Sequence, residues 1–464
     1  MRIKCGCLEW NRLEWNECGC LEWNGLEWNV LNGMEWQGGV DMQSLKTMIH
    51  KTILKLRYSR TWYRYRRLTY RADPVGEIMI IVDARIAGGE AGTAPSEIDL
   101  LAADKCLLIP SPRRDGVGIQ AMVRISTRFL ARQVNATYVH VPFTRLAHQR
   151  SDSVGKDYTF DAWAQKWEEF LNLGADAVHV SDLVQAHGRD AVIAALATRR
   201  KADRRRETTT LVERLLSAPG EVAGMHSPNL ELCRALHKAG LEFDAEYLEL
   251  LRARFAANGY VAEKEIFSDE FVDVAIHIRK GDVWKGAMAG ATQGGLSHRL
   301  VSEEYYVELL GRLQKFLAGL PKPVRFHVFS DGRPDDFPRF TFADERVASV
   351  RTQSGLMIEN IQFYPYQSAF DALYHMANAP VLVPSKSAFS VLALLVGDPI
   401  VVYESEITDF FMFKLLKKYM RASPHCVSLD EPESKSAEIT RKLVDRGKKP
   451  EKAWTYNVEP GSGL

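Results

Sequence analysis

The feature that most constrains the fold is a regular alternation of short apolar segments with amphipathic helical segments, which begins near residue 104. The pattern predicts buried strands at residues 105–110 and 136–143, and a helix between them at residues 119–134, where apolar side chains recur every three or four positions. A strand, a helix and a strand in this order predict a β-loop-α-β unit, and a further helix is predicted at residues 160–172.

The alternation returns after residue 270. Strands are predicted at residues 271–278, 324–330, 379–384 and 399–403, and helices at residues 302–318, 366–378 and 387–396. Two such sets predict an α/β protein with two Rossmann-like domains that face a cleft, and ligands in such sheets bind at the carboxyl ends of the strands. We place the two domains at residues 101–265 and 270–430, followed by a tail at residues 431–464.

The first hundred residues do not follow this pattern. Residues 5–16 recur as residues 18–29 with one difference in twelve positions, and a five-residue unit repeats inside each copy. A five-nucleotide DNA repeat translates into such a unit. We therefore interpret residues 1–40 as a repetitive head that is disordered or translated from simple-sequence DNA, and residues 41–100 as a basic leader and linker.

The overall composition argues against some classes of function. The net charge of +1 gives the molecule no global attraction to nucleic acid or membrane, so no nucleic-acid partner is expected. The longest apolar stretch is interrupted by charged residues and prolines, so no membrane span is expected either. A charge run at residues 199–206 is interpreted as a solvated helix face rather than as a binding patch.

The first motif with chemical potential lies where the strand at residues 271–278 ends. It runs from His277 through Arg279, Lys280 and Gly281 to Asp282, so a buried strand breaks into two cations and an acid. A guanidinium at a strand end can bind a diphosphate through two parallel hydrogen bonds. The alternative is a structural ion pair between Arg279 and Asp282.

The second motif, Ser330-Asp331-Gly332, also follows a predicted strand. A hydroxyl and a carboxylate at this position could hold a ribose or a base edge. The same residues are common in ordinary turns, so the motif is weak on its own.

The third motif includes Ser385, Ser387, Ala388, Phe389 and Ser390, where a predicted strand opens into a helix. Hydroxyls and backbone amides at the start of a helix form an anion site. The alternative is simple capping of the helix by one of the first two serines.

The order and spacing of these motifs resemble the fucosyltransferase superfamily that contains the α1,2-, α1,6- and protein O-fucosyltransferases. The family pattern is His-x-Arg-Arg/Lys-x-Asp, a strand ending in Ser-Asp, and Ser-x-Ser-x-Phe-Ser before an apolar helix. The turn with Gly116, Gly118 and Gln120, which opens the helix at residues 119–134, is similar to the family's first N-terminal turn. The resemblance covers residues 104–150 and 271–403.

The resemblance implies a GT-B enzyme that moves fucose from GDP-fucose to a glycan or protein hydroxyl by an inverting, metal-independent displacement. The first domain would then bind the acceptor and the second the nucleotide. Arg279 would hold the β-phosphate and neutralise the leaving GDP, with Lys280 beside it. Asp331 and the Ser385–Ser390 turn would hold the nucleotide, and Gly118 would let the backbone approach the donor.

The sequence also departs from the family pattern. Lys280 replaces a second arginine, and Ala287 stands where α1,6 members carry an acid, so the base that activates the acceptor cannot be carried over. Asp282 is the first candidate for that base and His277 the second, and either could instead orient Arg279. No cofactor or metal is expected. The localisation stays open: relatives in eukaryotes work in the Golgi or secretory lumen behind an N-terminal anchor, so this protein would work there if it is eukaryotic and its anchor is missing, and in the cytoplasm otherwise.

Three other functions remain open at this stage. The first is a GT-B transferase for another nucleotide sugar. The second is a catalytically inactive relative that binds a nucleotide or a carbohydrate. The third, a nucleic-acid-binding protein, rests only on the basic stretch at residues 42–72.

Overall fold

The computed structural model describes residues 106–430 with several short gaps. The gaps are 112–114, 144–145, 147–159, 199, 203–204, 229, 282–300, 366–367, 405–406, 408–409, 411 and 423–425. The repetitive head, the basic leader and the tail therefore lie outside the described residues, as do Asp282 and Ala287.

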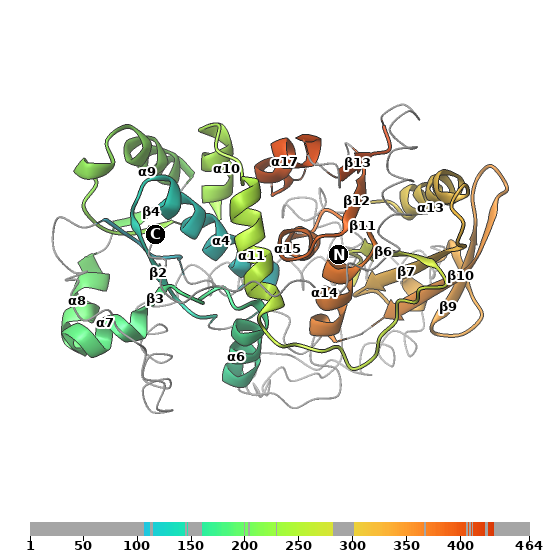
Figure 1. The fold of residues 1–464 in the computed structure, drawn as a ribbon, viewed down its shortest axis with the longest axis horizontal. Helices are drawn as coiled ribbons and strands as arrows, with labels where there is room; N and C mark the ends of the chain where they lie inside the picture. Colours follow the sequence, from blue (N-terminus) through green and yellow to red (C-terminus); the bar gives the residue numbers. More distant parts are fainter. Residues whose placement is uncertain are drawn as a thin grey trace, which may run out of the picture.

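The first half of the described chain is built on a parallel sheet of five short strands, in the order β3-β2-β1-β5-β4 (Figure 1). The strands are β1 (Cys106–Leu108), β2 (Thr137–His140), β3 (Val178–His179), β4 (Arg200–Ala202) and β5 (Gly224–Pro228). Every pairing between these neighbours is parallel, so their carboxyl ends share one edge of the sheet.

Helices connect and cover these strands. They are α4 (Val117–Gln133), α6 (Phe160–Leu171), α7 (Val180–His187), α8 (Arg189–Thr198), α9 (Arg205–Ser217), α10 (Glu231–Lys238) and α11 (Ala245–Ala256), with a 3₁₀ turn at Pro219–Glu221. The helix α11 begins at a side-chain cap, because Asp244 accepts a hydrogen bond of 2.8 Å from the backbone amide of Tyr247.

The second half is built on a sheet of eight strands, in the order β13-β12-β11-β6-β7-β10-β9-β8. The strands are β6 (Val272–Ile278), β7 (Val324–Ser330), β8 (Phe340–Phe342), β9 (Val347–Arg351), β10 (Met357–Pro365), β11 (Val381–Val383), β12 (Ile400–Tyr403) and β13 (Cys426–Ser428). The six strands from β13 to β10 run parallel, while β9 and β8 add antiparallel pairs at one edge.

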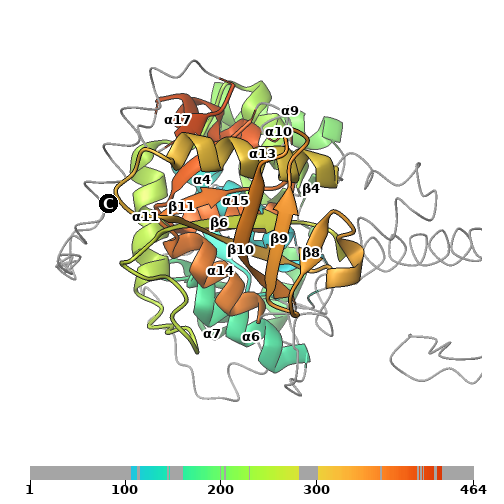
Figure 2. The ribbon, with the colours of Figure 1, turned by 90° about the vertical axis from the view of Figure 1, so that its right-hand side faces the viewer.

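The helices of this half are α13 (Glu303–Leu317), α14 (Ala369–Asn378), α15 (Ala388–Val396) and α17 (Lys417–Ala422), with 3₁₀ turns η3 (Pro334–Asp336) and η4 (Phe413–Leu416). Figure 2 shows α13 on one face of the second sheet and α14 on the other. This arrangement follows from right-handed crossovers, because the connection from β6 to β7 and the connection from β10 to β11 run in opposite directions along the sheet.

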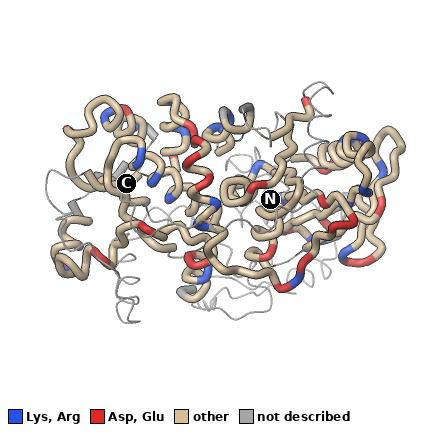
Figure 3. Tube along the Cα trace, in the orientation of Figure 1, with Lys and Arg blue, Asp and Glu red and all other residues tan. Residues whose placement is uncertain are grey.

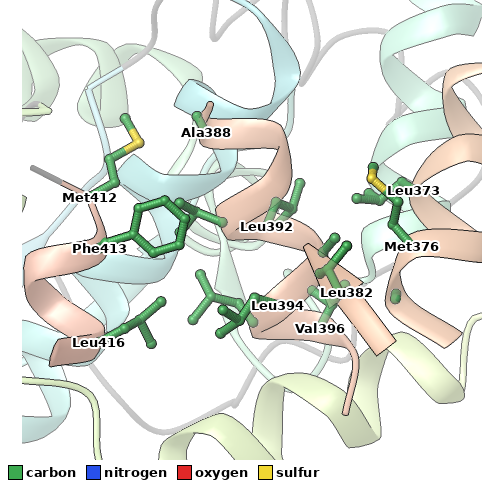
Figure 4. Packing of buried hydrophobic residues seen from close by; sticks show 14 of the residues in the cluster. Leu373, Met376, Leu382, Ala388, Leu392, Leu394, Val396, Met412, Phe413 and Leu416 are labelled. Carbon is green, nitrogen blue, oxygen red and sulfur yellow. The ribbon is translucent and has the colours of Figure 1, made fainter. Parts of the chain in front are cut away.

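The helix α15 joins the two halves at the centre of the molecule. All of its residues except Phe389 are buried, which fits its almost wholly apolar sequence. It packs against α14 of its own half and against α4 and α11 of the first half. Figure 4 shows its leucines meeting side chains of α14, β11 and η4. A single hydrophobic cluster therefore runs through both halves.

The predicted fold class is confirmed, since the structure is α/β with two mainly parallel sheets that alternate with helices. The predicted helix at residues 119–134 corresponds to α4, and the strand at residues 271–278 corresponds to β6. The interpretation of residues 199–206 as one helix face is wrong in part. The segment Arg200–Ala202 forms the edge strand β4, and α9 begins only at Arg205, because β5 offers a free edge with which β4 can pair.

Charges of both signs are spread over both halves, as Figure 3 shows. This distribution agrees with the near-zero net charge of the chain. None of the helices that the structure describes has the length and apolar character needed to cross a bilayer.

The glycine that ends α15 gives a test of this packing. A Cβ atom at Gly397 would lie 2.1 Å from the carbonyl oxygen of Ala377, which belongs to the backbone of α14. We expect Gly397→Ala to lower the free energy of unfolding by about 1–3 kcal/mol, because the two segments would have to move apart. Urea denaturation would measure the change.

The matched control is Gly319→Ala, since nothing lies within 4 Å of a Cβ atom at that position. This control is expected to leave the free energy of unfolding within about 0.5–1 kcal/mol of the wild type. Equal effects of the two substitutions would contradict the described contact between α14 and α15.

Candidate functional site

The three motifs come together because their strands are neighbours. In the second sheet β6 lies between β11 and β7, with Val383 paired to Ile276 and Ile278 paired to Ser330. All three strands are parallel, so the residues that follow them lie at one edge of the sheet. The chain leaves β6 toward β7 and leaves β11 toward β12, in opposite directions. A switch of this kind marks the ligand crevice in open α/β sheets.

Asp331 binds the turn that follows β6. One of its carboxylate oxygens accepts hydrogen bonds from the backbone amides of Lys280, at 2.8 Å, and Gly281, at 3.0 Å. The other oxygen forms an ion pair with Arg279 at 2.7 Å. Arg279 thus pairs with Asp331 among the described residues, while the alternative pair with Asp282 lies outside them. The two backbone amides hold the carboxylate, and the carboxylate in turn holds the guanidinium.

Glycine is required where this carboxylate meets the turn. A Cβ atom at Gly281 would lie 2.3 Å from a carboxylate oxygen of Asp331. Ser330 stabilises the same turn from the other side, because its hydroxyl donates to the carbonyl of Ile278 at 2.7 Å and accepts from the amide of Gly332 at 3.1 Å. The Ser-Asp-Gly motif therefore shapes the strand end itself. Its predicted contact with a nucleotide remains a prediction.

Lys280 points away from Asp331. Its ammonium group binds Glu303, the first residue of α13, at 2.9 Å and lies 4.5 Å from the centre of the Phe337 ring. The second oxygen of Glu303 accepts a hydrogen bond from the backbone amide of Arg339. Lys280 thus anchors the turn after β6 to α13. Glu303 and Phe337 are partners that the sequence did not reveal, although Glu303 falls inside the helix predicted at residues 302–318.

His277 lies beneath this turn and contacts the third motif. Its Nδ1 atom lies 2.5 Å from the hydroxyl of Ser390 and 3.0 Å from the hydroxyl of Ser385. Burial is the main reason that the pKa of His277 falls to about 4; the charge of Asp331 opposes this shift and the charge of Arg279 adds to it. The imidazole is therefore neutral at pH 7 and acts as a hydrogen-bond partner for the two hydroxyls. This arrangement is that of an orienting residue.

The start of α15 completes the edge. Ser387 is its cap, since its hydroxyl accepts a hydrogen bond from the amide of Phe389. Ser385 does not cap the helix; its own amide donates to the hydroxyl of Ser390 at 3.0 Å. The first turn of α15 thus lies next to the end of β6, where His277 contacts Ser385 and Ser390.

The glycine turn of the first half reaches the same place. A Cβ atom at Gly118 would lie 2.7 Å from the carbonyl carbon of Ala388 and 2.8 Å from the amide nitrogen of Phe389. The missing side chain at Gly118 therefore lets the first turns of α4 and α15 touch. Gly116 precedes α4 as its cap residue, and Gln120 is buried with its amide bonded to the carbonyl of Asp115 at 3.1 Å. Direct contact of these residues with a donor remains a prediction.

The described part of the chain holds no group of three histidine, cysteine or acidic side chains that is placed to bind a metal ion. The expectation of a metal-independent site stays a prediction. The candidate base Asp282 lies outside the described residues. The edge thus offers a guanidinium held in one direction and the start of α15, which together suit an anionic ligand such as a diphosphate.

Of the comparisons with known proteins, only the one with solved structures finds similar chains. Neither a protein-family model nor a curated protein matches the chain. Among solved structures it resembles fucosyltransferase NodZ from Bradyrhizobium, at 15% identity over 63% of this chain and 94% of that chain, with a TM-score of 0.31. It also resembles NodZ alpha-1,6-fucosyltransferase soaked with GDP-fucose, at 14% identity over 63% and 93% of the chains, with a TM-score of 0.31.

Both solved structures are fucosyltransferases, which is the family that the sequence motifs resemble.

The buried pair of Lys280 and Glu303 gives a test of the turn. Their side chains are only 4% and 8% exposed. We expect Lys280→Met to cost about 3–5 kcal/mol of unfolding free energy, because it leaves the carboxylate of Glu303 buried without its cation. The double variant with Glu303→Leu should recover much of this loss. A double-mutant cycle in urea would measure both.

The surface pair of Lys238 and Glu213 is the control, with side chains 67% and 59% exposed. Lys238→Met should cost less than about 1 kcal/mol. A similar loss for Lys280→Met would mean that Lys280 does not anchor the turn.

The pKa of His277 gives a second test, because it lies near 4 in the folded protein and its ordinary value is 6.5. The stability contributed by neutral His277 is fully present above pH 6.5 and is lost as the pH falls through about 4. The free energy of unfolding should therefore fall over this range by up to about 3 kcal/mol more in the wild type than in His277→Asn.

Asparagine is the chosen replacement because its side-chain oxygen can accept from the two serine hydroxyls without titrating. Urea unfolding at a series of pH values would compare the two proteins. If the free energy of unfolding changed with pH in the same way in both proteins, His277 would not be held neutral by burial, and the prediction would be wrong.

Proposed function

We propose that this chain transfers fucose from GDP-fucose to a hydroxyl group of a glycan or protein, by an inverting displacement that needs no metal ion. The observation that carries the proposal is the convergence of three motifs at the switch point of the second sheet. Arg279 follows β6, Asp331 follows β7, and the serine-rich turn follows β11. The same three motifs, in this order, resemble those of fucosyltransferases.

Arg279 is the residue proposed to neutralise the leaving group. Its side chain is 25% exposed, so it can reach a ligand, while Asp331 holds it in one direction. In the proposed step the bond between the sugar and the β-phosphate oxygen breaks, and negative charge grows on that oxygen. A guanidinium that is already in place stabilises this charge without reorganisation.

The start of α15 is proposed to share this task. The positive end of a helix dipole favours an anion at its first turn, where Ser387 provides a hydroxyl. His277 holds Ser385 and Ser390 from below, so that the turn keeps one shape when the donor binds. These contacts would substitute for the divalent cation that other sugar-nucleotide enzymes use.

The acceptor hydroxyl must lose a proton as the new bond to the sugar forms. Asp282 is proposed as the base that accepts this proton, because it lies one residue beyond the turn that Asp331 holds. His277 is the second candidate, but its burial and its bonds to two serines favour an orienting role. The acceptor itself is proposed to be a glycan or a glycoprotein.

Donor binding tests the proposal. The full chain would be heated with GDP-fucose, GDP-mannose, GDP, UDP-glucose or no ligand, each with and without EDTA. GDP at 100 times its dissociation constant should add about 2.7 kcal/mol of apparent stability, and EDTA should not change this. Arg279→Ala should weaken GDP binding about tenfold to hundredfold, because it removes charge-assisted hydrogen bonds.

The control variant is Arg351→Ala, which removes an exposed arginine on β9 and should leave GDP binding unchanged. Stabilisation by UDP-glucose alone would point to a different nucleotide sugar. Binding of GDP-fucose with no transfer to any glycan or glycoprotein in an acceptor screen would point to an inactive binding protein. No response to guanine nucleotides would contradict the proposed donor site.

A further inference from the structure

A buried arginine links the glycine turn of the first half to the end of β2. Arg124 lies on α4, six residues beyond Gly118, and is 1% exposed. Its guanidinium donates to the carbonyl of Val141 at 2.8 Å, to that of Pro142 at 2.7 Å and to that of Gln120 at 3.0 Å. Since β2 ends at His140, the first two carbonyls belong to the chain that leaves the sheet rather than to the sheet itself.

A buried glutamate holds the next residue of the same segment. Glu168 comes from α6, and one of its oxygens accepts a hydrogen bond of 3.0 Å from the backbone amide of Phe143. The other oxygen binds Nε2 of His140 at 2.5 Å. Burial raises the pKa of Glu168, but His140 and Arg124 outweigh this effect and leave that pKa below its usual range. The carboxylate is therefore charged near neutral pH.

Arg124 and Glu168 thus act on the same short segment from two sides. The guanidinium of Arg124 also lies 4.2 Å from the centre of the Phe143 ring. Residues 141–143 are consequently held by three backbone hydrogen bonds to charged side chains and by one ring contact. Charge-assisted bonds of this kind are stronger than neutral ones. The segment lies at the carboxyl edge of the first sheet, where ligands of such sheets bind.

The start of α4 packs against the serine-rich turn that is proposed to hold the nucleotide. Its first turn touches the first turn of α15, because Gly118 has no side chain to separate it from Ala388. The helix therefore connects the turn proposed to hold the nucleotide with the segment that leaves β2. Its first part is buried, so it cannot shift without moving its neighbours.

We infer that Arg124 and Glu168 are positioning residues that fix residues 141–143, as part of the acceptor side, relative to the donor turn through α4. The inference rests on the proposed function only in assigning residues 141–143 to the acceptor side. The contacts themselves do not depend on the reaction. Neither residue is placed in contact with substrate, and their effect would pass through the backbone of residues 141–143.

Hydrogen–deuterium exchange tests the positioning directly. Arg124→Lys keeps the charge, but a single ammonium group cannot reach all three carbonyls. In this variant the peptide that contains Val141 to Phe143 should exchange about tenfold faster than in the wild type, since local opening becomes easier. Arg132→Lys is the matched control, because it makes the same chemical change on the exposed face of α4, where Arg132 pairs with Glu246.

Steady-state kinetics separates positioning from a purely structural role, because a purely structural role would not raise the KM for one substrate alone. With an acceptor found by the screen above, Arg124→Lys should raise the KM for the acceptor about tenfold while the KM for GDP-fucose stays within about twofold. The thermal shift produced by GDP should also be unchanged. A weaker affinity for GDP with an unaltered acceptor KM would overturn the inference.

The inference can still be tested if no acceptor is found or if Arg124→Lys does not fold. If no acceptor is found, the proposed function fails, but the exchange measurement still decides whether Arg124 holds residues 141–143. If Arg124→Lys does not fold, Glu168→Gln replaces it, because a neutral amide cannot offer oxygens to both Phe143 and His140. Unchanged exchange of the peptide in the folded variant would overturn the inference, and faster exchange there would support it.

Discussion

The carboxylate of Asp331 is the contact on which the rest of the candidate site depends. It binds two backbone amides and the guanidinium of Arg279 at the end of β7. These contacts join the ends of β6 and β7 into one rigid corner, formed by Arg279, Lys280, Gly281 and Asp331. Without it, Arg279 would be a long side chain with several rotamers, and ordering such a side chain at the moment of binding costs affinity. Lys280 completes the corner by tying the same turn to α13.

The candidate site also depends on the close contact between the first turns of α4 and α15. Gly118 allows α4 of the first half to approach α15 of the second, and the hydrophobic cluster continues through that contact. Because α15 follows β11 directly, the contact brings the glycine turn of one half to the serine-rich turn of the other. The relative position of the two turns is thus set by packed backbone rather than by a flexible linker.

Much of this could be predicted from the sequence, because the parallel strands are short apolar runs bounded by polar turns. The strands β6, β7 and β11 fall where the pattern placed them, and so do the motifs that follow them. The partners could not be predicted in the same way. Arg279 pairs with Asp331, which lies 52 positions away in the chain, and the sequence pattern did not single out this partner. Pairings of β8, β9 and β10 also depend on contacts that local periodicity does not encode.

The most direct test of the account is a crystal structure of the full chain with GDP in the presence of EDTA. We expect the diphosphate to lie at the carboxyl ends of β6 and β11, within hydrogen-bond distance of Arg279 and of the first turn of α15. Asp331 should keep its contact with Arg279, so that the corner hardly moves on binding. A nucleotide bound elsewhere, or a diphosphate that contacts neither Arg279 nor α15, would contradict the central claim.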